Sequence, residues 1–438
     1  MNDRKVLVTK REVLYIICAV FLFFEIYLME EINFFRYTDE LIAVLCLLNV
    51  IVSAFQRKLD RMHIYMLLLM VLVMCIGLAS NYFAEMQTNW KPIATDIGNT
   101  FKVFVTYIGA SLYLRPVKSK KRIISALAVV MRCFVVVLFV CMVLHFTGIY
   151  RMGIDVRYGL PSFQFINFGA GQLSFMFYAI FLILTADLRY DDHKKNRKIF
   201  FLILAGVVWV STLRTRAFMY VLGYVGLYYL IIVKNYHIRF NWKTVLLAAA
   251  VLYIFSADQI DLYFNNPDNA RARFLRFGFF TMERFFPFGA GFATYGTDAA
   301  VVYYSRLYNQ YRFPLVWGLS PTYPIFAHDT YWPAIMGQFG AFGLIAMVLV
   351  LVCLCLDIIK KSKCDKYAYL AGMFIVITQV SSSIATATFF HFVTLGLLFL
   401  VPLLFEEKDT IDESRENDET SNRLYPNLQS SQGPAPGI

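Results

Sequence analysis

Long apolar stretches recur along nearly the whole chain, and they constrain its fold more than any other feature. About twelve of them approach the roughly 20 apolar residues that a helix needs to cross a bilayer. Charged residues make up only 16% of the 438 positions, against about 25% in an average soluble domain. The sequence therefore predicts an all-α integral membrane protein and excludes a soluble enzyme, a disordered chain or a disulfide scaffold. The predicted spans are 12–30, 40–56, 64–82, 98–114, 123–147, 163–186, 198–213, 217–233, 243–258, 331–356, 367–383 and 386–405.

Lysine and arginine concentrate in alternate short loops. With twelve spans, all of these loops fall on one side of the membrane, and the positive-inside rule makes that side cytoplasmic. Both termini are then cytoplasmic. The formal charge of +11 reflects these loops, so we expect no nucleic-acid partner. The basic segments are the N-terminus, 57–61, 115–122, 189–198, 234–243 and 360–366.

Residues 199–233 form one long apolar stretch that only Arg214 and Arg216 interrupt. A single helix here would reverse the sidedness of every later loop and export the basic ones. We therefore predict two short helices joined by a hairpin at 211–217, with the tip near the outer headgroups.

Four regions follow from this topology. Residues 1–258 carry transmembrane helices 1–9, and 331–405 carry helices 10–12. Between them, 259–330 form a large extracytoplasmic loop, and loops of such length usually have a function. Residues 406–438 contain eight acidic and three basic residues and read as a disordered, acidic cytoplasmic tail. The basic N-terminus lacks a small-residue cleavage site, so we expect a retained first helix.

The predicted outer segments carry arginine without lysine. Six arginines occur in the large loop, two more in 148–162 and two in the hairpin. The planar guanidinium fork matches phosphate oxygens in pairs, whereas lysine is a point charge. The pattern indicates an outer-face anion site, with pairing to lipid headgroups or loop carboxylates as the alternative. The arginines are Arg271, Arg273, Arg276, Arg284, Arg306, Arg312, Arg151, Arg157, Arg214 and Arg216.

Residues 270–286 have the spacing of an amphipathic helix. Arg273, Arg276 and Arg284 share a face with two phenylalanines at about 100° per residue, so the helix is expected to lie along the membrane surface. The Pro/Gly turn 287–292 follows it.

His328 lies where the large loop re-enters the membrane. A neutral imidazole there can act as a general base near neutral pH. The alternative is an interfacial histidine bonded to backbone. Asp329 is adjacent, but neighbouring helical residues do not face each other, so we do not assign it as the group that orients His328.

Four segments, taken in order, resemble the O-antigen polymerase and O-antigen ligase superfamily of bacterial envelope enzymes. About twelve predicted spans, with one large outer loop before the tenth, are also similar to that superfamily. The segments are RYGLPSFQFIN (157–167), STLRTRAF (211–218), ERFFPFGAGFATYG (283–296) and FAHDTYWPAIMGQFGAFGLI (326–345).

The resemblance implies a glycosyl transfer on the outer face of the bacterial inner membrane. The donor would be a glycan on undecaprenyl pyrophosphate, and neither metal nor cofactor would take part. His328 matches the histidine of the family's His-Asn pattern, with Asp329 in place of the asparagine. Arg216 matches the arginine of a Ser-Arg-small signature, and spacing does not choose the loop arginine among Arg271, Arg273 and Arg276. We predict His328 as the catalytic residue and Asn167 and Asp329 in the substrate pocket. The predicted pyrophosphate ligands are Arg216, Arg214, Arg276, Arg273 and Arg157.

The leading functional hypothesis is a polymerase of a cell-surface polysaccharide that extends a glycan linked to undecaprenyl pyrophosphate. Its partners would be that lipid-linked oligosaccharide, membrane lipid, a chain-length regulator and a flippase. One alternative is a ligase that moves the finished glycan to another acceptor. The other is a transporter or flippase, although the inverted repeats and charged midplane pairs typical of transporters are not evident in the sequence.

Overall fold

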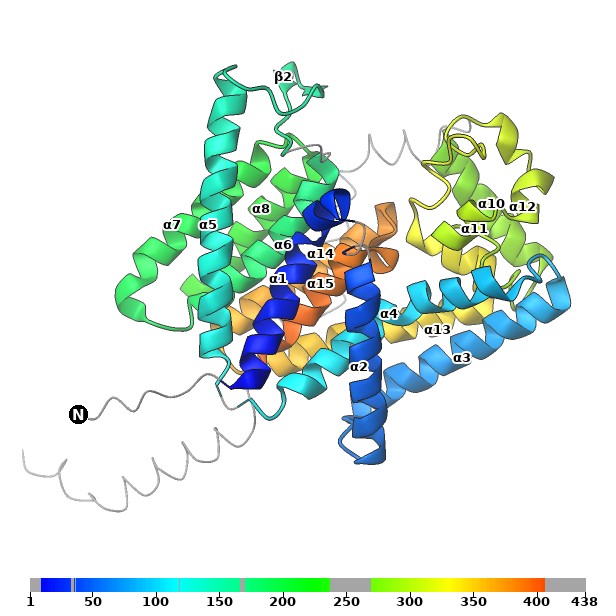
Figure 1. The fold of residues 1–438 in the computed structure, drawn as a ribbon, viewed down its shortest axis with the longest axis horizontal. Coiled ribbons are helices and arrows are strands. Elements are labelled where there is room, and N and C mark those ends of the chain that lie inside the picture. Colours follow the sequence, from blue (N-terminus) through cyan, green and yellow to red (C-terminus); the bar gives the residue numbers. More distant parts are fainter. Residues whose placement is uncertain are drawn as a thin grey trace, which may run out of the picture.

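The computed structural model describes residues 9–32, 35, 37–117, 119–165, 170–236 and 269–405. Helices dominate these residues, and one short hairpin is present (Figure 1). The predicted span 243–258, the start of the large loop at 259–268 and the acidic tail 406–438 lie outside the described ranges.

The N-terminal part consists of long helices joined by short turns. Thr9 begins the first helix with a capping box, because its side chain accepts from the Glu12 amide at 3.3 Å while Glu12 accepts from the Thr9 amide at 2.9 Å. The helices are α1 (Lys10–Glu31), α2 (Thr38–Phe55), α3 (Arg61–Ala84), α4 (Trp90–Leu114) and α5 (Lys121–Phe146).

The middle of the chain contains the only strands among the described residues, a two-residue pair that forms a hairpin before the next helix. Its elements are β1 (Val156–Arg157), β2 (Leu160–Pro161), α6 (Ala170–Asp187), the 3-10 turn η2 (Asp192–Lys194), α7 (Lys195–Val210), α8 (Thr215–Tyr228) and the π-helical turn η3 (Tyr229–Val233).

The C-terminal part combines three loop helices with the helices that close the core. The elements are α10 (Ala270–Arg284), α11 (Asp298–Val302), α12 (Arg306–Gln310), η5 (Phe313–Leu315), α13 (Tyr331–Ser362), α14 (Lys366–Ala385), η6 (Thr388–Phe390), α15 (Phe392–Leu400) and η7 (Val401–Leu404).

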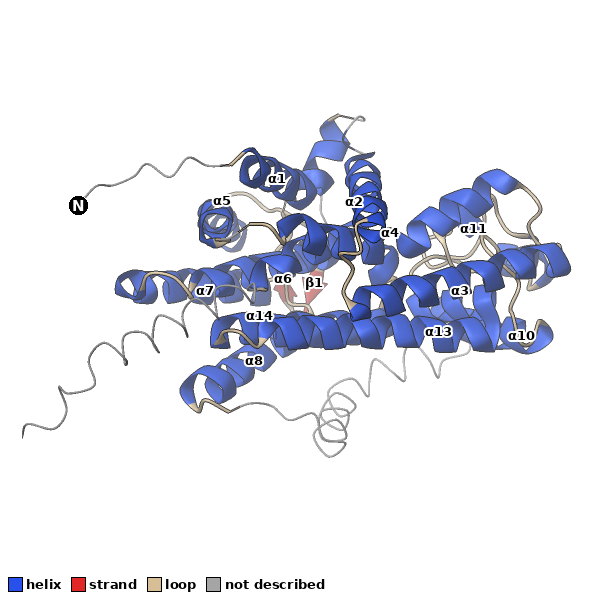
Figure 2. Ribbon diagram, turned by 90° about the horizontal axis from the view of Figure 1, so that it is seen from below, coloured by secondary structure: helices blue, strands red, loops and turns tan. Residues whose placement is uncertain are grey.

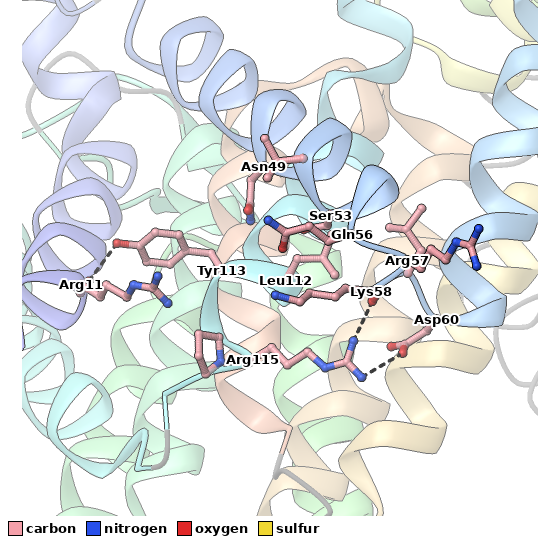
Figure 3. Close-up of a pocket in the computed structure, with 13 residues that line it drawn as sticks. Arg11, Asn49, Ser53, Gln56, Arg57, Lys58, Asp60, Leu112, Tyr113 and Arg115 are labelled. Carbon is pink, nitrogen blue, oxygen red and sulfur yellow. Dashed lines mark hydrogen bonds and ion pairs between the residues drawn. The ribbon is translucent and has the colours of Figure 1, made fainter.

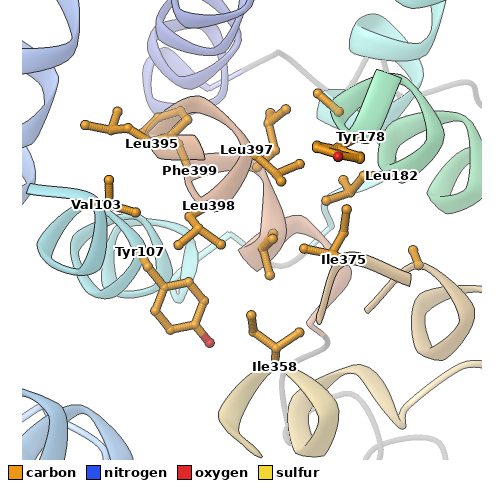
Figure 4. Packing of buried hydrophobic residues seen from close by; sticks show 14 of the residues in the cluster. Val103, Tyr107, Tyr178, Leu182, Ile358, Ile375, Leu395, Leu397, Leu398 and Phe399 are labelled. Atoms are coloured by element: carbon orange, nitrogen blue, oxygen red, sulfur yellow. The ribbon is translucent and has the colours of Figure 1, made fainter. Parts of the chain in front are cut away.

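Helix α15 lies at the centre of the packing and contacts α1, α2, α4 and α6. Its leucines and Phe399 meet Tyr107, Tyr178 and Ile375 in a dry apolar core (Figure 4). Helices α3 and α13 lie alongside each other, and α2 packs on α4 (Figure 2). Helices α10, α11 and α12 gather at one end of the molecule (Figure 1).

Within the described ranges, six helices are long and apolar enough to cross a membrane: Thr38–Phe55, Arg61–Ala84, Lys121–Phe146, Thr215–Val233, Tyr331–Ser362 and Lys366–Ala385. Helix α1 and helix α4 also coincide with predicted spans, and α6, α7 and α15 are shorter helices at predicted positions. The structure therefore has the helical character predicted for a membrane protein. The count of twelve spans stays a prediction.

The sixth predicted span begins later than expected. Residues 161–165 are not helical, and α6 begins at Ala170. The Phe163 amide donates to the Ser211 carbonyl at 3.1 Å, and the Ser162 hydroxyl donates to the Thr212 carbonyl at 2.7 Å. These bonds hold the segment extended against the α7–α8 turn. Gln164 therefore does not lie on a helix, although it falls within the predicted span 163–186.

The prediction of two helices in 199–233 is confirmed. Helix α7 ends at Val210 and α8 begins at Thr215, and the two helices pack against each other. The break therefore lies at the arginine-bearing segment, as the sidedness argument required.

Helix α13 is broken at Gly340, where φ is 62° and ψ is −159°. The Pro/Gly turn 287–292 fills the break: the amides of Ala290 and Gly291 donate to the carbonyls of Gly337 and Gln338 at 2.9 and 2.8 Å. Carbonyls freed from the helix ladder thus gain partners. The turn joins the large loop to α13.

The basic loops contact one another. Arg115 donates to the Lys58 carbonyl at 2.6 Å, Lys361 lies 3.0 Å from Asp60, and Arg189 lies 3.4 Å from Asp365. Loops 57–61, 115–122, 189–198 and 360–366 therefore lie at one side of the molecule, as the topology predicted.

Candidate functional site

The hairpin and the α7–α8 turn bring three predicted site residues together. Ser162 and Phe163, directly after the hairpin, bond to Thr212 and Ser211. The hairpin itself contacts the start of α8 through Tyr158, whose hydroxyl lies 3.1 Å from the Thr215 hydroxyl. Arg157 lies on β1, while Arg214 and Arg216 flank the first residue of α8. A guanidinium nitrogen of Arg214 lies 3.9 Å from Asp155, which precedes the hairpin. Arginines from two separate segments thus share one region.

Arg216 stacks on an aromatic pair. Its guanidinium carbon lies 4.9 Å from the centroid of Phe175 on α6, and the ring of Phe175 stacks on His391 with centroids 5.4 Å apart. A planar cation over an aromatic face is attracted by the ring quadrupole. This contact keeps the guanidinium of Arg216 next to the ring of Phe175.

At the end of the large loop, Arg271 of α10 forms an ion pair with Asp329. Its Nε donates to a carboxylate oxygen of Asp329 at 2.8 Å, and a terminal nitrogen contacts the same oxygen. Burial raises the pKa of Asp329 above its ordinary value, while Arg271, His328 and Arg216 act in the opposite direction. Asp329 therefore lies within electrostatic range of arginines from both α10 and α8.

His328 is accessible and faces a carboxylate. Its side chain is 41% exposed, and its Nε2 lies 4.0 Å from Oδ1 of Asp298, the first residue of α11. Its Nδ1 is buried and has no hydrogen-bond partner among the residues that the structure describes. The separation from Asp298 is too long for a hydrogen bond but short enough for electrostatic stabilisation of an imidazolium.

A buried polar cluster positions the start of α11. Asp96 of α4 accepts from the Ala293 amide at 2.5 Å and from Gln338 Nε2 at 2.8 Å. The same Gln338 nitrogen lies 3.2 Å from the hydroxyl of Thr297, the cap residue just before Asp298. The break in α13, the loop and α4 are thereby joined directly behind His328 and Asp298.

The structure distinguishes among the loop arginines. Arg271 pairs with Asp329, Arg273 is half-buried on α10, and Arg276 is exposed. Helix α10 itself is as predicted in extent, but it packs on α13 and on the aromatic core of the loop, with Phe277 stacked on Tyr311 at 4.6 Å. Asn167 lies outside the described residues.

Four residues near this site were not predicted from the sequence: His391, Asp298, Lys102 and Asp39. Asp298, Lys102, Arg216 and Asp39 all lie within electrostatic range of His391, and Lys102 forms an ion pair with Asp39 at 2.5 Å. The Thr-Asp pair at 297–298 is typical of a helix start, and this pattern could have indicated Asp298. No comparable pattern marks His391.

Comparison with known proteins gives no relative: no family model and no curated protein matches the chain. What can be stated is therefore a class. The chain is a mostly helical protein with several helices of membrane-spanning type. At one end of its bundle it carries a cluster of arginines, histidines and aspartates.

Proposed function

We propose that the protein is a membrane glycosyltransferase that polymerises a cell-surface polysaccharide. It would move a glycan from undecaprenyl pyrophosphate to a sugar hydroxyl of another lipid-linked repeat unit, on the outer face of a bacterial inner membrane. Twelve spans, cytoplasmic termini, and a flippase and chain-length regulator as partners belong to the same proposal.

One observation carries most of this proposal. Arg271 of α10 forms an ion pair with Asp329, the residue that follows His328 in the chain. Asp329 is also within electrostatic range of Arg216. The candidate general base His328 and two arginines, one from α10 and one from α8, therefore all lie within electrostatic range of Asp329. This is the arrangement that a pyrophosphate leaving group and an attacking hydroxyl require.

The proposed step is a displacement at the anomeric carbon. The acceptor hydroxyl oxygen forms the new bond to that carbon, and the bond from the carbon to the pyrophosphate oxygen breaks. The hydroxyl proton goes to His328. We assign Nε2 because Nδ1 is buried, and Asp298 then stabilises the resulting imidazolium.

The leaving undecaprenyl pyrophosphate carries the negative charge that develops. The guanidinium of Arg216 lies over the ring of Phe175. We assign Arg216 as the principal residue that stabilises this charge, with Arg214 and Arg157 beside it. Preorganised donors are effective because they need no reorganisation during the reaction. Arg271 is the loop arginine that we favour, because its ion pair holds it at Asp329, the residue next to His328.

The test is a reaction with purified full-length protein, lipid-linked repeat units and a chelator, with product length measured by gel electrophoresis. We expect a ladder of polymer that the chelator does not abolish. In the His328→Ala variant the rate should fall by about 10²–10⁴-fold, the usual contribution of general acid–base catalysis. The Asp298→Asn variant should retain part of the activity, because Asp298 only stabilises the charged imidazole.

Full-length polymer made at the normal rate by His328→Ala would refute the catalytic assignment. Transfer of a single preformed glycan to a different acceptor, without elongation, would indicate the ligase alternative. Movement of the lipid-linked glycan across proteoliposomes without any covalent product would indicate a flippase.

A further inference from the structure

A cavity of about 850 Å³ lies on the side of the molecule that carries the basic loops, away from the site around His328. It is enclosed by the first turn of α1, the C-terminal end of α2, the loop before α3 and the C-terminal end of α4 (Figure 3). Its lining includes Arg11, Lys58, Arg115, Asn49 and Gln56. Figure 3 shows the charged groups of Arg11 and Lys58 directed towards the space between these elements.

The cavity has an excess of positive charge. Asp60 is the one carboxylate among its described lining residues, and it is already paired with Lys361 at 3.0 Å and Arg115 at 3.7 Å. Burial acts to raise the pKa of Asp60, but Lys361, His63 and Arg115 outweigh it and hold the pKa below its usual value. Within the described ranges, Arg11 and Lys58 form no ion pair. Their charges are therefore available to an anion.

Hydrogen bonds to the end of α4 hold the backbones of both cationic residues in place. Arg115 donates to the Lys58 carbonyl at 2.6 Å, and the hydroxyl of Tyr113 donates to the Arg11 carbonyl at 3.3 Å. The backbones of Lys58 and Arg11 are thus bonded to the end of α4, while their charged ends remain exposed. A preorganised pair of cations loses less entropy on binding than two mobile side chains.

One wall of the cavity continues into an apolar surface. Val52 lines the cavity, and Leu48 and Phe55 lie on the same helix, all three exposed. Helix α2 is long and apolar enough to cross a membrane, so this strip would face acyl chains. A soluble phosphate compound would use the cations but not the strip, whereas an amphiphile would use both.

We propose that this cavity binds the headgroup phosphate of an anionic phospholipid, with its acyl chains along Leu48, Val52 and Phe55. Lys58 and Arg11 contact the phosphate, and Asn49 and Gln56 are placed to hydrogen-bond the remaining headgroup. Basic pockets between membrane helices commonly take such headgroups. The proposal is independent of the proposed glycosyltransfer.

The binding test uses the full-length protein, delipidated in a neutral detergent. Native mass spectrometry measures the dissociation constants of phosphatidylglycerol and phosphatidylcholine, and glycerol 3-phosphate serves as a soluble competitor. We expect phosphatidylglycerol to bind more tightly than phosphatidylcholine. Glycerol 3-phosphate should displace it only at far higher concentration, because it lacks acyl chains.

The matched variants remove two charges each from the same side of the protein. Arg11→Gln with Lys58→Gln removes the two cavity cations that we assign to the phosphate. Lys360→Gln with Lys363→Gln removes two exposed cations that do not line the cavity. The cavity variant should bind phosphatidylglycerol about 30-fold more weakly, since each cation near an anionic lipid contributes about 1 kcal/mol. The control variant should bind it as the unmodified protein does.

Three results would overturn the proposal. Equal weakening in both variants would show general charge attraction instead of a site. Equal affinity for glycerol 3-phosphate and phosphatidylglycerol would make the ligand a soluble phosphate. Binding of phosphatidylglycerol only after the acidic residues of 406–438 are replaced by their amides in the full chain would make the tail the occupant.

Discussion

At the scale of single residues, the chemistry of the site depends on the shape of the charged groups as well as on their charge. The guanidinium of Arg216 lies over the ring of Phe175, which in turn stacks on His391. A guanidinium can stack and still present two parallel donors to phosphate oxygens, while an ammonium cannot. The position therefore favours arginine for a geometric reason.

Replacing Arg216 by lysine should lower the rate of polymer formation by at least about tenfold, although the charge is kept. The expected loss corresponds to one charge-assisted hydrogen bond of about 1.5–3 kcal/mol. The measurement is the initial rate in the purified assay. Arg151→Lys is the control, because Arg151 is exposed in the coil before the hairpin. Similar rates in both variants would argue against a pyrophosphate clamp at Arg216.

At the scale of elements, the break in α13 is what joins the large loop to the helical bundle. Gly340 adopts φ 62° and ψ −159°, a region open essentially only to glycine. A Cβ at this position would lie 2.4 Å from the Pro287 carbonyl oxygen and 2.5 Å from the Gly289 amide nitrogen. The Pro/Gly turn and the broken helix therefore fit together only without a side chain here.

The Gly340→Ala variant should be clearly less stable, because backbone strain of this kind costs about 1–3 kcal/mol and the clash adds to it. Its apparent unfolding temperature in detergent should fall. In the control Gly98→Ala, the new methyl group meets nothing within 4 Å, and alanine favours the helix by up to about 1 kcal/mol. An unfolding temperature for Gly340→Ala equal to that of the control would show that the α13 break does not need glycine.

At the scale of the whole molecule, the helices of the large loop and the basic loops lie on different sides of the fold. The basic loops contact one another, and α10 to α12 gather around their own core of Phe274, Tyr295 and Tyr308. If the basic side is cytoplasmic, this loop core is extracytoplasmic.

A cysteine at position 302 tests that orientation. Val302 is 76% exposed on the loop, whereas Ala300 nearby is fully buried and would be a poor reporter. In intact spheroplasts, Val302→Cys should react with a membrane-impermeant thiol reagent. The unmodified protein, whose exposed Cys364 lies in the basic loop 360–366, should not react until the cells are opened. The reverse pattern would invert the topology.

Most of the helical layout could be predicted from the sequence. Apolar stretches of about 20 residues permit few alternatives to a helix in a bilayer, and the basic loops required a break before Thr215. The predicted start of the sixth span, at residue 163, was wrong, because hydropathy does not reveal the backbone bond from Phe163 to the α7–α8 turn. Such bonds join residues distant in sequence.

By itself, the sequence determined which arginines and which histidine are candidates for the site, because arginine suits an anion and histidine can accept a proton. It did not determine which of them meet. Tertiary structure selected Arg271 to pair with Asp329, set Asp298 beside His328 and placed Phe175 beneath Arg216. Each of these contacts joins residues of separate helices or loops. The distance between such residues depends on how the helices pack and on where α13 breaks.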